Sequence, residues 1–236
     1  MTLPPQQPAT LRIATYNIQK CVGLDLRRKP SRILRVIDAL AAQIITLQEA
    51  DKRLPPRPAA LPAFAVEQEG WKIVPLGGAG SLGWHGNAIL HRGEVALRQS
   101  DRIPLPGLEP RGAVLAEFDT GVGPLRVIGL HLGLLATWRR MQLHRLSRCL
   151  RERPAMPTVW AGDFNDWDRN PLLLRAAPAM RFLAPLPSFP AAAPVAPLDR
   201  IAVSGGLAVG GHGAWTAQPA HVASDHLPVW ADLKRP

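Results

Sequence analysis

The stretch TVWAGDFND at residues 158–166 begins as an apolar run and ends in polar side chains. The run predicts a buried β-strand, and Asp163 and Asn165 follow directly after it. A carboxylate beside a buried strand is costly unless it has a partner. Asp163 is therefore predicted to sit in a built polar site rather than on a bare surface.

Other apolar runs along the chain also border on polar side chains. These residues are Asn17, Glu49, His131, Asp199, Asp225 and His226. Strand ends in layered α/β folds point toward a common rim. The set is therefore predicted to converge with Asp163 and Asn165 on one cleft.

The residue types in this cleft suit hydrolysis of a phosphoester by water. Glu49, Asn17 and Asp225 offer hard oxygen ligands, which favour Mg²⁺ or Mn²⁺. Asp163 is able to take a proton from a water that Asn165 holds. His131 and His226 are able to neutralise charge on a phosphoryl oxygen. Asp199 is able to fix the tautomer and orientation of the His226 imidazole.

The regular elements alternate through the chain, which predicts an α/β or α+β fold. The strand candidates are Leu11–Tyr16, Ile44–Gln48, Trp71–Leu76, Ala88–Arg92, Val95–Arg98, Ala113–Phe118, Leu125–His131, Thr158–Ala161, Arg200–Val203 and Val229–Leu233. Two helices are predicted, one capped by Ser31 and running to about residue 42, and one over residues 137–151. Residues 176–197 are predicted to form a packed Pro/Ala-rich loop.

Composition bounds the class of protein. The chain has 236 residues, 47% of them hydrophobic and 19% charged, which excludes a disordered or collagen-like chain. Cys21 and Cys149 are too few for a disulfide framework or a four-cysteine zinc site, as expected of a cytoplasmic protein. No apolar run is long enough to cross a bilayer. Residues 1–10 are predicted to be a flexible N-terminus and residues 11–236 a single domain.

The charge balance points to an anionic partner. Lys and Arg number 28 against 18 Asp and Glu, a net charge of +10. Basic residues gather around residues 27–35 and 139–153, which suits either nucleic acid or an anionic membrane surface. The glycines at positions 78, 80 and 83 match a dinucleotide-binding spacing, but no helix pattern follows, so a loop is expected.

The motifs TYNI, LQEAD, GLHLG, GDFND, LDRI and SDHLP occur in this order, and the chain resembles the endonuclease/exonuclease/phosphatase superfamily, whose members include DNase I-like nucleases. The resemblance implies a four-layer α/β sandwich of two mixed sheets. It implies that Glu49 is the principal metal ligand, with Asn17 and Asp225 near the metal. It also implies substrate contacts by Arg111 and Asn87, at positions that resemble rim residues of the family.

The resemblance leaves the substrate open. A Mg²⁺-dependent or Mn²⁺-dependent phosphodiesterase acting on DNA or RNA is the leading hypothesis, and the charge favours it. The alternatives are phospholipase C-like or phosphatase action on a phospholipid or inositol phosphate headgroup, and a catalytically silent binding module. The chain is short for the superfamily, which leaves little room for loops that recognise DNA damage.

Overall fold

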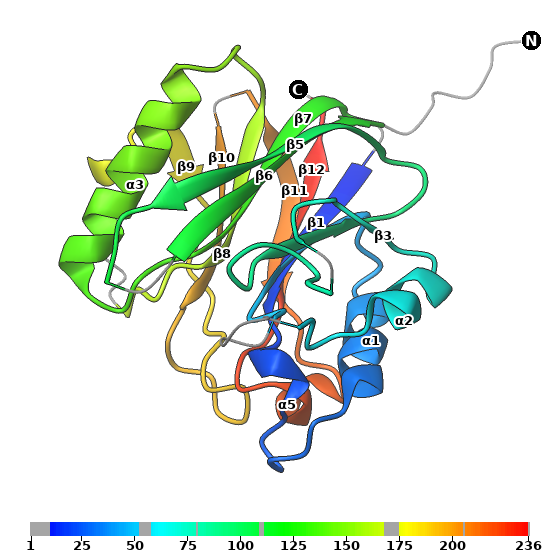
Figure 1. Cartoon of the computed structure of the whole chain (residues 1–236). Coiled ribbons are helices and arrows are strands. Elements are labelled where there is room, and N and C mark those ends of the chain that lie inside the picture. The colour runs from blue at the N-terminus through cyan, green and yellow to red at the C-terminus, as the bar shows by residue number, and fades with distance from the viewer. Residues whose placement is uncertain are drawn as a thin grey trace, which may run out of the picture.

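The computed structural model describes residues 10–51, 58–78, 80–108, 111–167, 175–204 and 206–235. Two six-stranded sheets pack face to face, with helices on their outer sides (Figure 1). The first sheet has the order β11 (Ala208–Ala214), β12 (Val229–Lys234), β1 (Thr10–Asn17), β2 (Ile44–Gln48), β4 (Ala88–His91) and β3 (Lys72–Ile73). The second has the order β5 (Ala96–Leu105), β6 (Arg111–Thr120), β7 (Gly123–His131), β8 (Thr158–Asp163), β10 (Asp199–Ser204) and β9 (Met180–Phe182).

Both sheets are mixed. The parallel pairs are β1 with β2 and β7 with β8, and the neighbouring pairs are antiparallel. The helices are η1 (Gln19–Cys21), α1 (Pro30–Ala39), α2 (Ala63–Gln68), α3 (Ala136–Arg151) and α5 (Ala220–Ala223). The four-layer α/β sandwich expected from the sequence is confirmed.

Side chains that alternate along the strands form the central layer. Ile13, Ile44 and Ile89 from the first sheet pack with Val127 and Val159 from the second. The opposite face of β1, with Ala14 and Tyr16, packs toward α1 instead. Strands β2, β4 and β8 bury both faces and are largely apolar, whereas the edge strand β5 is exposed over much of its length and carries polar side chains.

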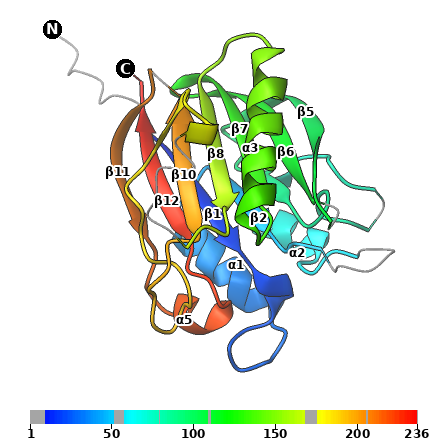
Figure 2. The ribbon, with the colours of Figure 1, turned by 90° about the vertical axis from the view of Figure 1, so that its left-hand side faces the viewer.

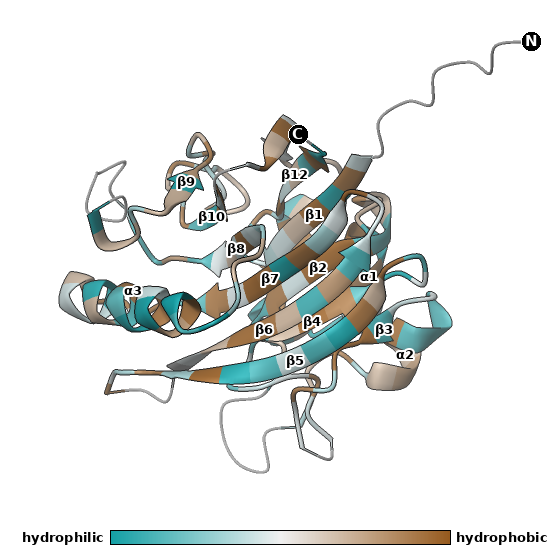
Figure 3. Ribbon diagram, turned by 90° about the horizontal axis from the view of Figure 1, so that it is seen from above, coloured by the Kyte–Doolittle hydropathy of each residue, from teal (hydrophilic) through white to brown (hydrophobic). Residues whose placement is uncertain are grey.

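Each outer helix buries one apolar stripe. Helix α1 buries Ile33 and Ile37 completely, and full burial of each such side chain contributes about 1.5–3 kcal/mol. Helix α3 buries Leu143 and Leu146 against the second sheet, and its residues Arg140, Arg145, Arg148 and Arg151 are exposed. Figure 2 shows α3 on the outer side of that sheet. The exposed side of α3 is strongly hydrophilic, as Figure 3 shows. No helix of the described residues is long and apolar enough to cross a membrane.

Several predicted boundaries differ from the structure. Ser31 does not cap α1, because Pro30 already occupies the first turn and Lys29 takes the cap position without a side-chain bond. The strand expected over residues 71–76 shortens to Lys72–Ile73, since Pro75 ends it. Strand β9 lies inside the region expected to be a loop, and β11 and α2 were not predicted. The predicted flexible N-terminus falls outside the described residues except for Thr10, which starts β1.

Candidate active site

The ends of four strands meet at the lower end of the molecule in Figure 1, near α5. In the second sheet His131 pairs with Asp163, and Asp163 pairs with Asp199, so three polar residues stand side by side. Asn17 ends β1 in the first sheet and donates from Nδ2 to Oδ2 of Asp163 at 3.1 Å. One amide therefore bridges the two sheets at the site.

Asp163 lies at the centre of this group and is 1% exposed. Its Oδ1 accepts the backbone N–H of Asn165 at 2.8 Å, and its Oδ2 lies 3.4 Å from Nε2 of His131 and 3.9 Å from Nε2 of His226. Burial, followed by the nearby charge of Asp199, raises the pKa of Asp163 to about 6. Near neutral pH this carboxylate is therefore able both to accept and to release a proton.

Asp199 and His226 form a buried pair beside it. Oδ2 of Asp199 lies 2.7 Å from Nδ1 of His226 and accepts the hydroxyl of Ser188 at 2.7 Å. Burial lowers the pKa of His226, but the charge and hydrogen bond of Asp199 outweigh that effect and raise the pKa to about 9. With Nδ1 donating to Asp199, Nε2 of the ring faces Asp163.

The backbone holds Asn165 in the left-handed region, at φ 50°. Asparagine tolerates this conformation better than most residues. Its side-chain Nδ2 donates to the carbonyl of Leu132 at 2.8 Å, which leaves Oδ1 as the acceptor end of the amide. The turn after β8 thus fixes Asn165 against the end of β7.

Glu49 also has a left-handed backbone, at φ 53°. Its carbonyl accepts the N–H of Lys20 at 3.1 Å, and its carboxylate forms an ion pair with the ammonium of the same lysine. A carboxylate that already binds a cationic group at the rim suits a divalent cation in charge and in donor type. Glu49 therefore fits the predicted role of metal ligand.

Among the described residues, one group of three acidic and histidine side chains has its ligand atoms close together. Ligand atoms of Asp163, Asp199 and His226 lie within 4.8 Å of one another, close enough for a possible metal site. Neither Glu49 nor Asp225 belongs to that described group. Asp225 lies next to His226, and its Oδ1 accepts the hydroxyl of Ser224 at 3.2 Å.

Of the two predicted rim residues, Asn87 and Arg111, the structure describes the side chain of Asn87. Asn87 is 1% exposed and donates from Nδ2 to the carbonyl of Gly112 at 2.9 Å, while its Oδ1 is buried without a hydrogen-bond partner in the described structure. Its amide thus joins the β4 region to the start of β6. Arg111 begins β6, but its side chain lies outside the described part of the chain.

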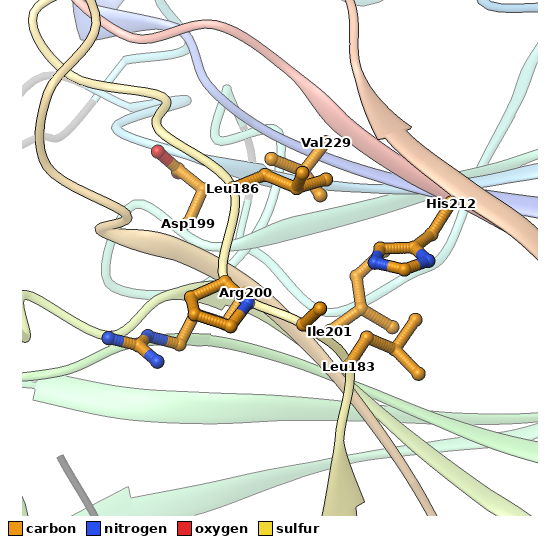
Figure 4. A pocket seen from close by; sticks show the side chains of 9 residues that line it. Leu183, Leu186, Asp199, Arg200, Ile201, His212 and Val229 are labelled. Carbon is orange, nitrogen blue, oxygen red and sulfur yellow. The ribbon is translucent and has the colours of Figure 1, made fainter. Parts of the chain in front are cut away.

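A small pocket borders this polar group, because Asp199 also lines it. Its lining is mainly apolar, with His212 as a polar edge, and Figure 4 shows the carboxylate of Asp199 pointing away from the apolar side chains. The labelled lining residues are Leu183, Leu186, Asp199, Arg200, Ile201, His212 and Val229. This pocket therefore does not form part of the candidate active site.

The order and the convergence of these residues agree with a comparison to known families. The model of the Endonuclease/Exonuclease/phosphatase family matches residues 14–226. The chain belongs to this family. Membership supports a phosphoester hydrolase and confirms the resemblance found in the sequence.

The chain matches relatives in sequence and solved structures in fold. The protein YbhP of Escherichia coli is 33% identical over 165 residues, which are 64% of this chain and 63% of YbhP. An endonuclease/exonuclease/phosphatase from Beutenbergia cavernae has a TM-score of 0.71 at 23% identity, covering 96% of this chain and 72% of that one. TDP2 of D. rerio, complexed with single strand DNA product, has a TM-score of 0.75 at 15% identity, covering 96% and 99%.

A third structure shows how widely the fold is used. The mannosyl-6-phosphatase Bt3783 of Bacteroides thetaiotaomicron has a TM-score of 0.73 at 17% identity, covering 94% of this chain and 99% of that one. The identities of these structures are low, so they establish the fold of this family member and not its substrate.

Some residues of the site have no signal in the sequence. Lys20 pairs with Glu49 because η1 turns back across the end of β2, and Ser188 reaches Asp199 from a loop 11 residues earlier. Ser224 donates to the carbonyl of Asn17, 207 residues away, and thereby attaches the loop that carries His226. These contacts depend on loop paths that single-sequence patterns do not specify.

Proposed function

We propose that this family member is a divalent-metal-dependent hydrolase that cleaves phosphodiesters with an activated water. The observation that supports this most directly is Asp163, a buried carboxylate with a pKa of about 6, held between Asn17, His131 and His226. A general base whose pKa lies near the working pH is effective in both proton uptake and release.

In the proposed reaction Asp163 takes a proton from the attacking water as the water oxygen bonds to the phosphorus. The P–O bond to the leaving oxygen breaks, and that oxygen departs as a hydroxyl group with a proton from solvent. The Oδ1 atom of Asn165 accepts a hydrogen bond from the same water and orients it toward the phosphorus. His226, protonated through its pair with Asp199, donates from Nε2 to a phosphoryl oxygen, and His131 neutralises further charge. This charge arrangement favours the transition state over the ground state.

The proposed metal ligands are Glu49, Asn17 and Asp225. The ion pair with Lys20 supports Glu49, because it shows the carboxylate facing a cationic group. A bound Mg²⁺ or Mn²⁺ supplies positive charge to phosphoryl oxygens. The cluster of Asp163, Asp199 and His226 is less suited to a cation, since the imidazolium of His226 already adds a positive charge to it and takes its place beside Asp199.

Nucleic acid is the proposed substrate class. The net charge of +10 favours a polyanion, since phosphate contacts supply most non-specific affinity. Exposed arginines on α3, among them Arg140 and Arg145, offer such contacts. The TDP2 relative was solved with a single strand DNA product, which is in keeping with this class.

A phospholipid headgroup is the second candidate. The exposed side chains of Leu134 and Leu135 favour it, because leucines beside a phosphoester site suit a lipid surface. They lie just after His131, on the loop before α3.

A metal-dependent turnover screen tests the proposal. Purified protein is incubated with Mg²⁺ or Mn²⁺ and supercoiled plasmid, single-stranded RNA or phosphatidylinositol vesicles, with Asp163→Asn as the contamination control. We expect nucleic acid cleavage that requires the metal and is lost in the variant. Cleavage of lipid alone would move the substrate to the second candidate, and no turnover of any phosphoester would refute the proposal.

A further inference from the structure

A line of three aromatic rings leads from the surface into the candidate active site. Trp167 is 60% exposed, and its ring meets Phe189 edge-on at 5.8 Å between centroids and 81° between planes. The ring of Phe189 in turn lies 4.9 Å from the imidazole of His226. Trp167 is therefore the outermost of three rings in successive contact, and the innermost ring belongs to a residue of the proposed reaction.

Both aromatic residues sit on anchored backbone. The N–H of Phe189 donates to the carbonyl of Ala196 at 3.1 Å, and its carbonyl accepts the N–H of Val195 at 2.9 Å. Asp166, directly before Trp167, pairs with Arg139 at 3.3 Å and its carbonyl accepts a hydrogen bond from Arg200 at 3.2 Å. The backbone directly before Trp167 is thus held in place, which fixes where the exposed indole lies.

Two exposed leucines, Leu134 and Leu135, lie on the loop that Arg139 joins to the turn before Trp167. Arg139 pairs with Asp166 and donates to the carbonyls of Gly133 and Leu134, so the loop with Leu134 and the turn with Trp167 are joined. Leu134 is 68% exposed and Leu135 is 60% exposed. Large apolar side chains gathered around a site for a charged group indicate a ligand with an apolar part next to its phosphate.

An unpaired nucleobase has this combination of properties. Its flat face stacks on aromatic rings, while the phosphate attached through the sugar remains charged. In a duplex the faces of the bases are already stacked, and only the phosphates and the groove edges are accessible. A duplex therefore has no free base face that could stack on Trp167. The positive charge of the chain complements the backbone of a single strand.

We propose that Trp167 and Phe189 form a stacking platform for an unpaired base adjacent to the scissile phosphodiester, so that the site prefers single-stranded nucleic acid. This inference rests on the proposed function for its phosphodiester. It adds a specificity subsite outside the residues that carry out the hydrolysis.

The test measures binding separately from turnover. In the Asp163→Asn background, fluorescence anisotropy compares a labelled single-stranded oligonucleotide with an abasic strand of the same length and charge. We expect the strand with bases to bind about 5- to 160-fold more tightly, the fold-change that corresponds to about 1–3 kcal/mol of stacking per base. Trp167→Leu should remove most of this preference, whereas Trp167→Phe should keep much of it because a flat ring remains.

A matched control is Phe64→Leu, which alters an aromatic residue on α2 that is 67% exposed. This control should leave the preference for bases unchanged. Equal binding of the base-containing and abasic strands, or a preference that survives Trp167→Leu, would overturn the platform even if the protein cleaves nucleic acid. Trp167-dependent binding to anionic phosphatidylglycerol vesicles without any preference for bases would also overturn it, in favour of a lipid surface.

The binding result also separates failure of this inference from failure of the proposed function. A preference for bases that depends on Trp167, in a protein that cleaves no nucleic acid, would support the platform and refute the nuclease activity. Cleavage without that preference would support the nuclease and refute the platform.

Discussion

Replacing Asp199 with asparagine should lower the pKa of His226 sharply. The carboxylate of Asp199 lies 2.7 Å from Nδ1 of the ring and is the main support for its protonated form. Together with the smaller effects of the charges of Asp163 and Asp225, it raises the pKa from 6.5 to about 9 against the opposing effect of burial. At 1.36 kcal/mol per pH unit, this change corresponds to about 3 kcal/mol in favour of the imidazolium.

In Asp199→Asn the charge is lost while the shape of the side chain is kept. The largest of the effects that raise the pKa is then gone, and we expect His226 to titrate well below pH 9. NMR titration of the imidazole nitrogens measures this directly in the folded protein. Asp225→Asn is the matched control, because Asp225 is the smallest of the named contributors and should shift the pKa much less.

The same pair predicts how stability depends on pH. The folded-state pKa of His226 is raised, so its contribution to the free energy of unfolding is fully present below about pH 6.5 and is lost as the pH rises through about 9. Urea unfolding from pH 5 to 10 should show this loss in the wild type and not in Asp199→Asn. An imidazole that still titrates near pH 9 in the variant would refute the assignment of Asp199 as its partner.

Three further predictions concern the base, the metal ligand and the core. Asp163→Asn should lower turnover by a factor of about 10² or more while the circular dichroism spectrum stays unchanged, and turnover near the wild-type rate would contradict the role of Asp163. Wild-type turnover should fall as the pH drops below about 6, because the pKa of Asp163 is raised to about that value. Glu49→Gln should move the midpoint of a Mg²⁺ titration of activity to higher concentration, and an unchanged midpoint would place the metal elsewhere. Ile37→Ala should reduce the free energy of unfolding by about 2–5 kcal/mol, because Ile37 is fully buried in α1; a loss below 1 kcal/mol in urea titration would show that the site collapses around the smaller residue.

Much of the candidate site could be predicted because strand ends are local features. Asn17, His131, Asp163 and Asp199 each stand at the border of an apolar run, and the structure brings all four together. Local patterns were less reliable at helix starts and short strands. Ser31 has the residue type of a cap, but Pro30 one position earlier starts the helix.

Motifs a few residues long were enough to indicate the family, and the resemblance to it implied the two-sheet sandwich. The borders of the apolar runs marked the polar residues of the candidate site. Only the tertiary structure decided the proton affinities of Asp163 and His226, since these depend on burial and on charges from distant parts of the chain. It also decided that Lys20 faces Glu49 and that Trp167 stands exposed next to Phe189. Such properties arise from distances between loops, and a single sequence does not specify the paths that bring those loops together.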